Sequence, residues 1–363
     1  MYKKLFIIIL ILLILIVMTK KKNMEENFTE NKITWNRNKC KYIIQENLQK
    51  VLDKYNIKND KKNAKIYFPC TYDDTIKEIN EMPDDAQYYF IIDNVDIIVA
   101  KNKLWDNIMK FHGLKKALTM APMTYLLMTE KDKIKREFNK NKIYILKSNN
   151  QRQEGLKITN SLNDILNSDN HVIVQELLQN PYLISGRKIN LRVYVLVICN
   201  INKIDIYVYD DGFIYYTKEL YKENSLEFDT NITTGYIDRE IYKNNPLTHK
   251  DLKKHLGNKQ DVIFQRIYNL LQDVFEPYLD KICNGKLKNK ISFQLFGADI
   301  ALDKELQPKI MEINKGPDMD SKDERDGKVK IGCLTDILKT LKIIEDTENN
   351  GFIHILEYEK DMK

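Results

Sequence analysis

Runs of hydrophobic residues separated by polar segments predict strands and helices along most of this chain. Apolar runs bounded by polar residues predict strands, whereas apolar residues spaced three or four apart predict helices. Strands that alternate with helices in the N-terminal part favour a small α/β domain with some parallel pairing. Strands are predicted within residues 64–70, 87–100, 141–159 (two strands around a polar loop), 171–178 and 186–199, and helices at 42–55, 73–81, 103–118, 262–282 and 334–344.

Residues 203–221 predict two further strands joined by a turn at Asp210-Asp211-Gly212, because Asp-Gly pairs favour tight turns. Residues 222–250 show no clear period. They predict a long irregular loop, the kind of segment that often carries function.

Residues 291–317 hold two apolar runs around a polar segment, which is typical of a β-hairpin. A turn centred after Glu305 places Asp299 directly opposite Glu312, with the Cβ atoms about 5 Å apart. Two carboxylates that close are costly unless a cation neutralises them. Asn314 points to the same side as Glu312, because side chains alternate along a strand. Such oxygen ligands favour Mg²⁺ that also holds substrate phosphates; an edge hairpin with solvated acids is the alternative.

The strand at 186–199 carries cations on one face. Its alternation places Lys188, Asn190 and Arg192 on one side and apolar residues on the other. This face is an anion site if it lines a cleft, and a solvated surface otherwise. Lys147 ends an earlier strand, where a lysine can reach a phosphate, although a surface lysine has the same pattern. The loop that follows lacks the glycines of a Walker loop or a dinucleotide fingerprint.

Residues 5–18 are uninterrupted apolar residues between two groups of lysines. As a helix this run is about 21 Å long, shorter than the roughly 30 Å hydrocarbon core of a bilayer, but the flanking lysines could extend it. No small-residue cleavage site follows, which favours an uncleaved anchor over a secretory signal. We therefore expect a single-pass membrane anchor with the catalytic part in the cytosol; a cleaved signal segment is the alternative.

Composition bounds the class of protein. The 363 residues suffice for two or three domains. The net charge is +6, and five lysines flank the apolar run, so the rest is close to neutral and nucleic-acid binding is not indicated. The five cysteines show no CxxC spacing, which argues for a reducing compartment and against a zinc site or a disulfide framework. These cysteines are Cys40, Cys70, Cys199, Cys283 and Cys333.

Four separated motifs occur between residues 122 and 314. Residues 122–127 read PMTYLL, 186–192 read GRKINLR, 293–299 read FQLFGAD and 310–314 read IMEIN. Their types and order resemble the Pro-x-Thr-Tyr/Phe-x-Leu, Gly-x-Lys-Phe-Asp-x-Arg, Phe-Glu-Leu-Phe-Gly-x-Asp and Leu-x-Glu-x-Asn motifs of the tubulin-tyrosine ligase-like family. The resemblance covers residues 100–345.

This resemblance implies an ATP-grasp fold and an ATP- and Mg²⁺-dependent ligase that joins amino acids to protein carboxylates. Together with the apolar run and the pattern of elements, it gives this division: 1–22 membrane anchor or signal segment, 23–62 tether and helix, 63–120 N-terminal α/β domain, 121–185 central ATP-grasp domain, 186–345 C-terminal ATP-grasp domain with the metal site, and 346–363 tail.

The resemblance also assigns roles to residues. It gives the metal to Asp299, Glu312 and Asn314, the set that the hairpin register selects independently. Catalysis is expected of Arg192 and Lys147, and substrate binding of Arg187, Asn190 and Lys315. The residues expected to bind ATP are Lys147, Glu154, Gly155, Gln175, Glu176, Leu177, Leu178, Lys188, Asn190, Thr233 and Thr234.

Three positions depart from the family pattern. Asn190 replaces an Asp, Tyr215 replaces an Arg expected after Gly212, and Asn231 replaces a His. Loss of one charged contact to a transferring phosphoryl group can slow the reaction by orders of magnitude. Arg187 or Lys315 could supply the missing charge.

Three functions are compatible with these features. In the first, an acceptor carboxylate attacks the γ-phosphorus of ATP, and an amino acid then displaces phosphate from the acyl phosphate. The second is an ATP-grasp ligase or kinase for a small molecule, and the third a membrane-tethered protein that binds ATP without turnover. For the first, the expected partners are a protein or peptide carboxylate, with tubulin a candidate, a free amino acid and a membrane, but no nucleic acid.

Overall fold

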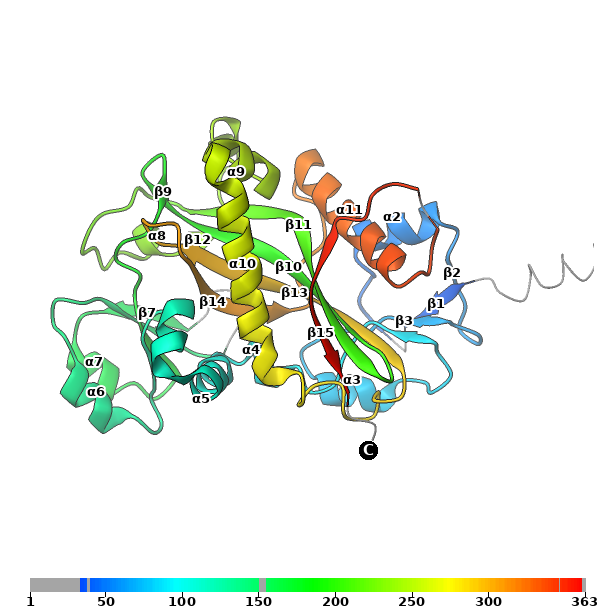
Figure 1. Ribbon diagram of the computed structural model, residues 1–363, viewed down its shortest axis with the longest axis horizontal. Helices are drawn as coiled ribbons and strands as arrows, with labels where there is room; N and C mark the ends of the chain where they lie inside the picture. Colours follow the sequence, from blue (N-terminus) through cyan, green and yellow to red (C-terminus); the bar gives the residue numbers. More distant parts are fainter. Residues whose placement is uncertain (1–32, 38–39, 150–154, 346, 361–363) are drawn as a thin grey trace, which may run out of the picture.

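The computed structural model describes residues 33–37, 40–149, 155–345 and 347–360, which form a mixed α/β fold with two sheets (Figure 1). The large sheet has the strand order β12-β11-β10-β13-β4-β3-β1-β2, with β14 beside β13, β15 beside β11 and β9 beside β10. The small sheet has the order β5-β8-β6-β7.

Long antiparallel strands form the centre of the large sheet. β10 pairs with β11 on one side and with β13 on the other, and β13 forms a hairpin with β14. Their apolar residues are almost fully buried and make the main core. The strands are β9 (Leu183–Ile184), β10 (Arg187–Cys199), β11 (Lys203–Thr217), β12 (Thr233–Thr234), β13 (Ile291–Leu302), β14 (Pro308–Lys315) and β15 (Phe352–Glu359).

The N-terminal strands extend this sheet with parallel pairs, as predicted. β1 pairs with β2 and β3, β3 pairs with β4, and β4 joins β13 where Tyr88 lies opposite Ile291. Strands from the 63–120 and 186–345 segments therefore share one sheet, and the domain boundaries stay a prediction. The strands are β1 (Thr34–Asn36), β2 (Lys58–Asn59), β3 (Ile66–Tyr67) and β4 (Tyr88–Tyr89).

The small sheet is antiparallel and has its own apolar core with α6 and α7, at the lower left of Figure 1. The predicted strand, loop and strand within 141–159 are β6 and β7. The elements are β5 (Thr124–Leu126), α6 (Lys131–Glu137), β6 (Tyr144–Lys147), β7 (Leu156–Thr159), α7 (Leu162–Leu166) and β8 (Ile173–Glu176).

Helices cover the large sheet. α10 crosses in front of it in Figure 1, and its apolar side is buried as the spacing predicted. It ends before Pro277, which lies in the short helix η3. The helices are α2 (Glu46–Lys54), α3 (Thr75–Glu81), α4 (Asp96–Val99), α5 (Lys101–Met120), α8 (Phe228–Asn231), η1 (Arg239–Lys243), α9 (His249–Leu256), η2 (Gly257–Lys259), α10 (Gln260–Phe275), η3 (Glu276–Tyr278) and α11 (Glu324–Thr340).

The predicted turn at 210–212 is wrong, because β11 runs through it as one strand with a register shift opposite Val193–Val195. Gly212 serves close packing here. A Cβ at this position would lie 2.3 Å from the carbonyl oxygen of Arg192 and 2.6 Å from the His249 ring.

Other boundaries also differ from the prediction. Only Tyr88–Tyr89 of the predicted strand 87–100 is a strand, and part of the remainder is α4. α11 begins at Glu324, well before the predicted start, because the Asp323 side chain accepts a hydrogen bond from the Asp326 N–H and caps the helix. Residues 346–363, predicted as a tail, contain β15.

Four of the five cysteines form disulfides, so the prediction of no disulfide framework is wrong. Cys40 is joined to Cys70 and Cys199 to Cys283, while Cys333 is free and buried. The partners lie 30 and 84 residues apart, so the fold and not local spacing brings them together. The argument for a reducing compartment loses its basis.

The membrane localisation is also corrected. The expected anchor, residues 1–22, lies outside the described residues. Within the part of the chain that the structure describes, no helix combines the length and the apolar character needed to span a bilayer.

Candidate functional site

A cavity of about 500 Å³ is lined by residues of both sheets. The large sheet contributes β10, β13 and β14, and the small sheet contributes β6, β7 and the segment after β8. The predicted site residues in its lining are Lys147, Leu177, Leu178, Lys188, Asn190, Arg192, Thr233, Thr234, Asp299, Glu312, Asn314 and Lys315.

Asp299 and Glu312 lie directly opposite each other on β13 and β14, as predicted. The predicted turn centre is off, because Leu302 pairs with Pro308 and a register shift between Asp299 and Ile300 restores the pairing of the two acids. Asp299 is buried and faces Arg192 on the neighbouring strand β10. Arg192 donates from Nε to Oδ1 over 2.6 Å and from Nη2 to Oδ2 over 3.1 Å. Burial disfavours the charged guanidinium, but the Asp299 carboxylate holds the pKa of Arg192 well above its usual value. A bidentate ion pair therefore crosses the floor of the cavity.

Glu312 lies among cations at the same place. The Nζ atom of Lys101 is 3.7 Å from its Oε2, and the Asn314 side chain donates to its Oε1 over 3.1 Å. Burial raises the pKa of Glu312, but Lys101 and then Lys147 outweigh burial and lower it. The pKa of Asp299 is raised instead, by burial and by the Glu312 carboxylate, against the effect of Arg192. Glu312 therefore ionises at a lower pH than Asp299.

Lys147 is buried at the end of β6, so the surface-lysine alternative does not hold. Its Nζ donates to the Gln175 side chain over 2.8 Å, and Gln175 in turn donates to Thr124. Burial lowers the pKa of Lys147 to about 8, while Glu312 opposes this shift. Gln175 therefore acts on the cavity through Lys147, since its own side chain is outside the lining.

Lys188 is a second buried lysine in the lining. Its Nζ donates to Asn231 over 2.8 Å and lies 4.9 Å from the centre of the Tyr221 ring. Burial lowers its pKa to about 8. Asn231, which replaces the family's His, is itself buried and lines the cavity.

The segment after β8 supplies apolar lining. Leu177 and Leu178 line the cavity, but Glu176 is turned to Lys142, whose Nζ is 2.7 Å from its Oε1. The backbone N–H of Glu176 donates to the Met123 carbonyl. The Glu176 side chain therefore lies outside the cavity lining, and its role in ATP binding stays a prediction.

Of the two neighbouring residues Glu154 and Gly155, both expected to bind ATP, the structure describes only Gly155. Gly155 has φ +67°, and a Cβ there would lie 2.2 Å from Ser148 Oγ, so the position requires glycine. Glu154 lies outside the described residues. Asn190 lies opposite Tyr215 on β11, and Thr234 lies opposite Tyr216.

Two expected substrate residues are engaged elsewhere. Arg187 donates to the carbonyls of Thr217 and Lys218 and is outside the lining. Lys315 lines the cavity, but its Nζ is 2.5 Å from Asp96 of α4.

Sequence reasoning missed several lining residues. Lys101 starts α5, and Lys322 and Lys330 come from the segment around the start of α11. Each is one lysine among many in this chain, so no local pattern marks it. Only the packing of α5 beside β14 and of α11 beside β11 could have identified them.

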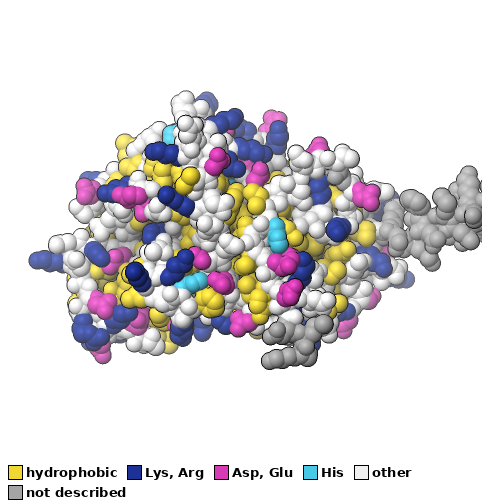
Figure 2. Space-filling view, in the orientation of Figure 1, with side chains coloured by type: hydrophobic (Ala, Val, Ile, Leu, Met, Phe, Trp, Pro, Cys, Tyr) yellow, Lys and Arg dark blue, Asp and Glu magenta, His cyan; other side chains and the backbone are white. Residues whose placement is uncertain are grey.

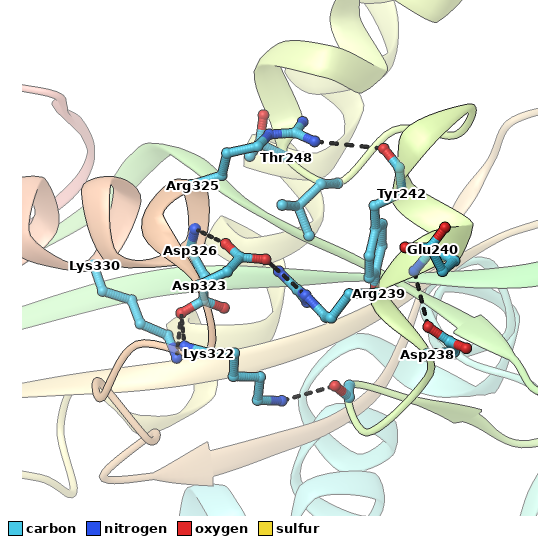
Figure 3. A network of polar contacts seen from close by, with 12 residues as sticks. Asp238, Arg239, Glu240, Tyr242, Thr248, Lys322, Asp323, Arg325, Asp326 and Lys330 are labelled. Atoms are coloured by element: carbon cyan, nitrogen blue, oxygen red, sulfur yellow. Dashed lines mark hydrogen bonds and ion pairs between the residues drawn. The ribbon is translucent and has the colours of Figure 1, made fainter.

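Figure 3 shows polar contacts between the segment after β12 and the residues at the start of α11. Lys322 donates to the Gly235 carbonyl over 2.8 Å and lies 4.1 Å from the centre of the Tyr236 ring. Arg239 forms an ion pair with Asp323 at the start of α11. These contacts tie the segment after β12 to α11.

Charge on this protein is distributed unevenly between surface and cavity. Basic and acidic side chains are interspersed on the face shown in Figure 2. The described cavity lining instead has seven cations against three acids. The cations are Lys101, Lys147, Lys188, Arg192, Lys315, Lys322 and Lys330, and the acids Asp299, Glu312 and Asp318. Such a lining favours an anionic ligand.

The donor set fits a Mg²⁺ ion. Asp299 and Glu312 offer carboxylate oxygens, which Mg²⁺ prefers. Asn314 donates its amide N–H to Glu312, an orientation in which its amide oxygen is the atom that could bind an ion.

The fold and the site define an α/β protein with a cationic, carboxylate-containing cavity between two sheets. The chain belongs to the tubulin-tyrosine ligase family, whose model matches residues 80–350. This match confirms the resemblance drawn from the motifs.

Curated relatives with similar sequences carry names within this family. The chain is 29% identical over 276 residues to a probable beta-tubulin polyglutamylase of Tetrahymena thermophila, covering 67% of this chain and 23% of that protein. It is 28% identical over 231 residues to tubulin polyglutamylase TTLL7 of Xenopus tropicalis, covering 56% of this chain and 25% of that protein. It is 26% identical over 267 residues to tubulin monoglutamylase TTLL4 of Mus musculus, covering 66% of this chain and 22% of that protein. The matched part thus spans no more than 25% of the length of these three relatives.

Proposed function

We propose that this chain is an ATP- and Mg²⁺-dependent ligase that joins an amino acid to a protein carboxylate through an amide bond. The observation that carries the proposal is the Asp299–Glu312 pair, which shares one cavity with Arg192, Lys147 and Lys188. Membership of the tubulin-tyrosine ligase family supports it.

In this proposal ATP lies between the segments 121–185 and 186–345, as the two domains of an ATP-grasp fold. Leu177 and Leu178 contact the base, and Lys147 and Lys188 bind phosphate oxygens. Gly155, Asn190, Thr233 and Thr234 complete the nucleotide site. Mg²⁺ held by Asp299, Glu312 and Asn314 would neutralise charge on the phosphates.

The reaction has two steps. A carboxylate oxygen of the acceptor attacks the γ-phosphorus, and the bond between this phosphorus and the oxygen of the β-phosphate breaks. ADP departs, and the acceptor becomes an acyl phosphate. Arg192 stabilises negative charge on the phosphoryl group during transfer. The amine nitrogen of the amino acid then attacks the acyl carbon, phosphate leaves, and the nitrogen loses a proton.

We propose tubulin as the acceptor and glutamate as the added amino acid. The names of the relatives, which are tubulin polyglutamylases and a tubulin monoglutamylase, support this choice. The surplus of cations in the lining also favours acidic substrates.

The test is incubation of the purified chain with tubulin, ATP, Mg²⁺ and isotope-labelled glutamate, followed by mass spectrometry of tubulin peptides. The expected result is labelled glutamate on tubulin carboxylates with one ADP released per glutamate added. Labelling of a small acid in place of tubulin would overturn the acceptor. Binding of ATP without ADP release under any acceptor would overturn the ligase.

A further inference from the structure

Arg192 is enclosed by residues from both neighbouring strands. Asp299 on β13 accepts hydrogen bonds from its Nε and Nη2, and the Tyr215 ring on β11 lies 5.2 Å from its Cζ. Gly297, also on β13, lies beside the Arg192 side chain. A Cβ at Gly297 would lie 3.0 Å from Cδ and 3.2 Å from Nη1 of Arg192. The guanidinium therefore lies against a strand on one side and a ring on the other.

Tyr215 is itself held in place. It faces Asn190 across β10 and β11, two residues from the position opposite Arg192, so both side chains emerge on the same side of the sheet. A Cβ at Gly235 would lie 3.1 Å from the Tyr215 Cε1 atom, so the ring packs against the segment after β12. Lys322 fixes that segment by its bond to the Gly235 carbonyl. Tyr215 thus packs between Arg192 and the segment after β12, which Lys322 holds in place.

We propose that Tyr215 is a positioning residue that holds the Arg192 guanidinium for phosphoryl transfer, an inference that rests on the proposed function. An arginine has five N–H donors in one plane, and Asp299 accepts two of them here. The cation–π contact with the Tyr215 ring, 5.2 Å from Cζ, holds the guanidinium in place on its other side. The other N–H groups then keep one orientation in the cavity that Arg192 lines.

A residue that acts in this way affects the rate more than substrate binding. A displacement of a catalytic group by about 1 Å can cost about 100-fold in rate. Loss of the ring should therefore lower kcat with little change in KM for ATP. A residue that instead touches ATP in the ground state would raise KM.

The kinetic test compares Tyr215→Phe, which keeps the ring, with Tyr215→Leu, which removes it. We expect kcat of Tyr215→Phe within about twofold of wild type and that of Tyr215→Leu about 10- to 100-fold lower, with KM for ATP unchanged in both. In combination with Arg192→Lys, the loss from Tyr215→Leu should shrink to less than about threefold, because the two residues act together. Tyr216→Phe is the matched control, since that ring lies on the opposite side of the strand and its hydroxyl donates to the Pro246 carbonyl.

A spectroscopic readout separates this inference from the proposed function. In protein labelled with ¹⁵N-arginine, the Arg192 Hε signal is assigned by its loss in Arg192→Lys. Because the ring shields protons above its face, this signal should move downfield in Tyr215→Leu and stay near its wild-type position in Tyr215→Phe. This shift is measurable even if the wild type ligates nothing.

Three results would overturn the inference: an Hε signal that Tyr215→Leu leaves in place, a Tyr215→Phe variant as slow as Tyr215→Leu, or full additivity with Arg192→Lys. A different outcome is possible: the Hε signal shifts as expected, but the wild type releases no ADP. That outcome would overturn the proposed function and the catalytic part of the inference, while the contact between Arg192 and Tyr215 would stand.

Discussion

Asp299 and Glu312 face each other across the β13–β14 pair, and each lies beside a different cation. Asp299 is bound by Arg192, and Glu312 has Lys101 3.7 Å away. Two acids that close are stable together because these cations share the site. A metal ion that binds Asp299 or Glu312 therefore competes with Arg192 or Lys101 for that carboxylate, and a phosphate competes with the carboxylate for the cation.

Glu312→Gln should abolish ATP turnover, with a loss of at least about 100-fold, while the fold remains. The change removes a charge and a proposed metal ligand but keeps the shape of the side chain. ADP release measures the activity, and the far-ultraviolet circular dichroism and melting temperature report the fold.

Glu357→Gln is the matched control, because Glu357 lies on β15, pairs with Lys203 and is absent from the cavity lining. Its ADP release should equal that of the wild type within about twofold, since exposed ion pairs contribute little. Normal turnover by Glu312→Gln would remove the metal role of this residue.

ATP affinity should fall as pH rises through about 8. Burial lowers the pKa of Lys147 and of Lys188 to about 8, so the free protein loses these positive charges above that pH. The Kd for ATP, from titration calorimetry, should rise by about 100-fold between pH 7 and pH 9, about tenfold for each lysine. Lys188→Arg should weaken this dependence, because a guanidinium stays protonated. A flat profile in the wild type would show that neither lysine binds phosphate.

The same lysines link stability to pH. Unfolded lysine has a pKa of about 10.4, above the folded value, so between pH 8 and that value the unfolded state binds more protons. The contribution of these lysines to the free energy of unfolding therefore rises with pH in this window. Denaturant unfolding of the ATP-free protein at pH 7 and pH 9.5, compared with Lys147→Met, isolates this contribution.

Gly297→Ala should lower kcat by at least about tenfold, because the new Cβ would lie 3.0 Å from Arg192 Cδ and push the guanidinium from Asp299. Gly113→Ala is the control. Gly113 has φ +76° with nothing within 4 Å, so its change should cost about 1 kcal/mol of stability without an effect on kcat. Equal kcat in Gly297→Ala and wild type would show that the Arg192 position is unimportant.

Denatured but unreduced protein should expose about one thiol. Two disulfides and the buried Cys333 account for all five cysteines of the chain. Titration with a thiol reagent before and after reduction measures the count. Five thiols without reduction would contradict both disulfides.

The sequence predicted the central hairpin from a local pattern. Alternation and a short polar turn suggested the pairing of Asp299 with Glu312, but the hairpin reaches this pairing only through a register shift between Asp299 and Ile300, which no local period indicates. The cationic face of β10 was predicted from alternation as well.

Features that depend on packing between distant segments were not predictable in this way. Lys101 reaches Glu312 only because α5 lies beside β14. Gly212 looked like a turn residue, whereas it makes room for the His249 ring. The cysteine pairs likewise depend on contacts between segments 30 and 84 residues apart.

The most direct test of the account is calorimetric titration of ATP into the wild type and into Glu312→Gln, each with and without Mg²⁺. The account predicts that Mg²⁺ tightens ATP binding at least about tenfold in the wild type and has little effect in the variant. Equal ATP affinity of the wild type with and without Mg²⁺, or equal tightening in the variant, would contradict a metal site at Asp299, Glu312 and Asn314.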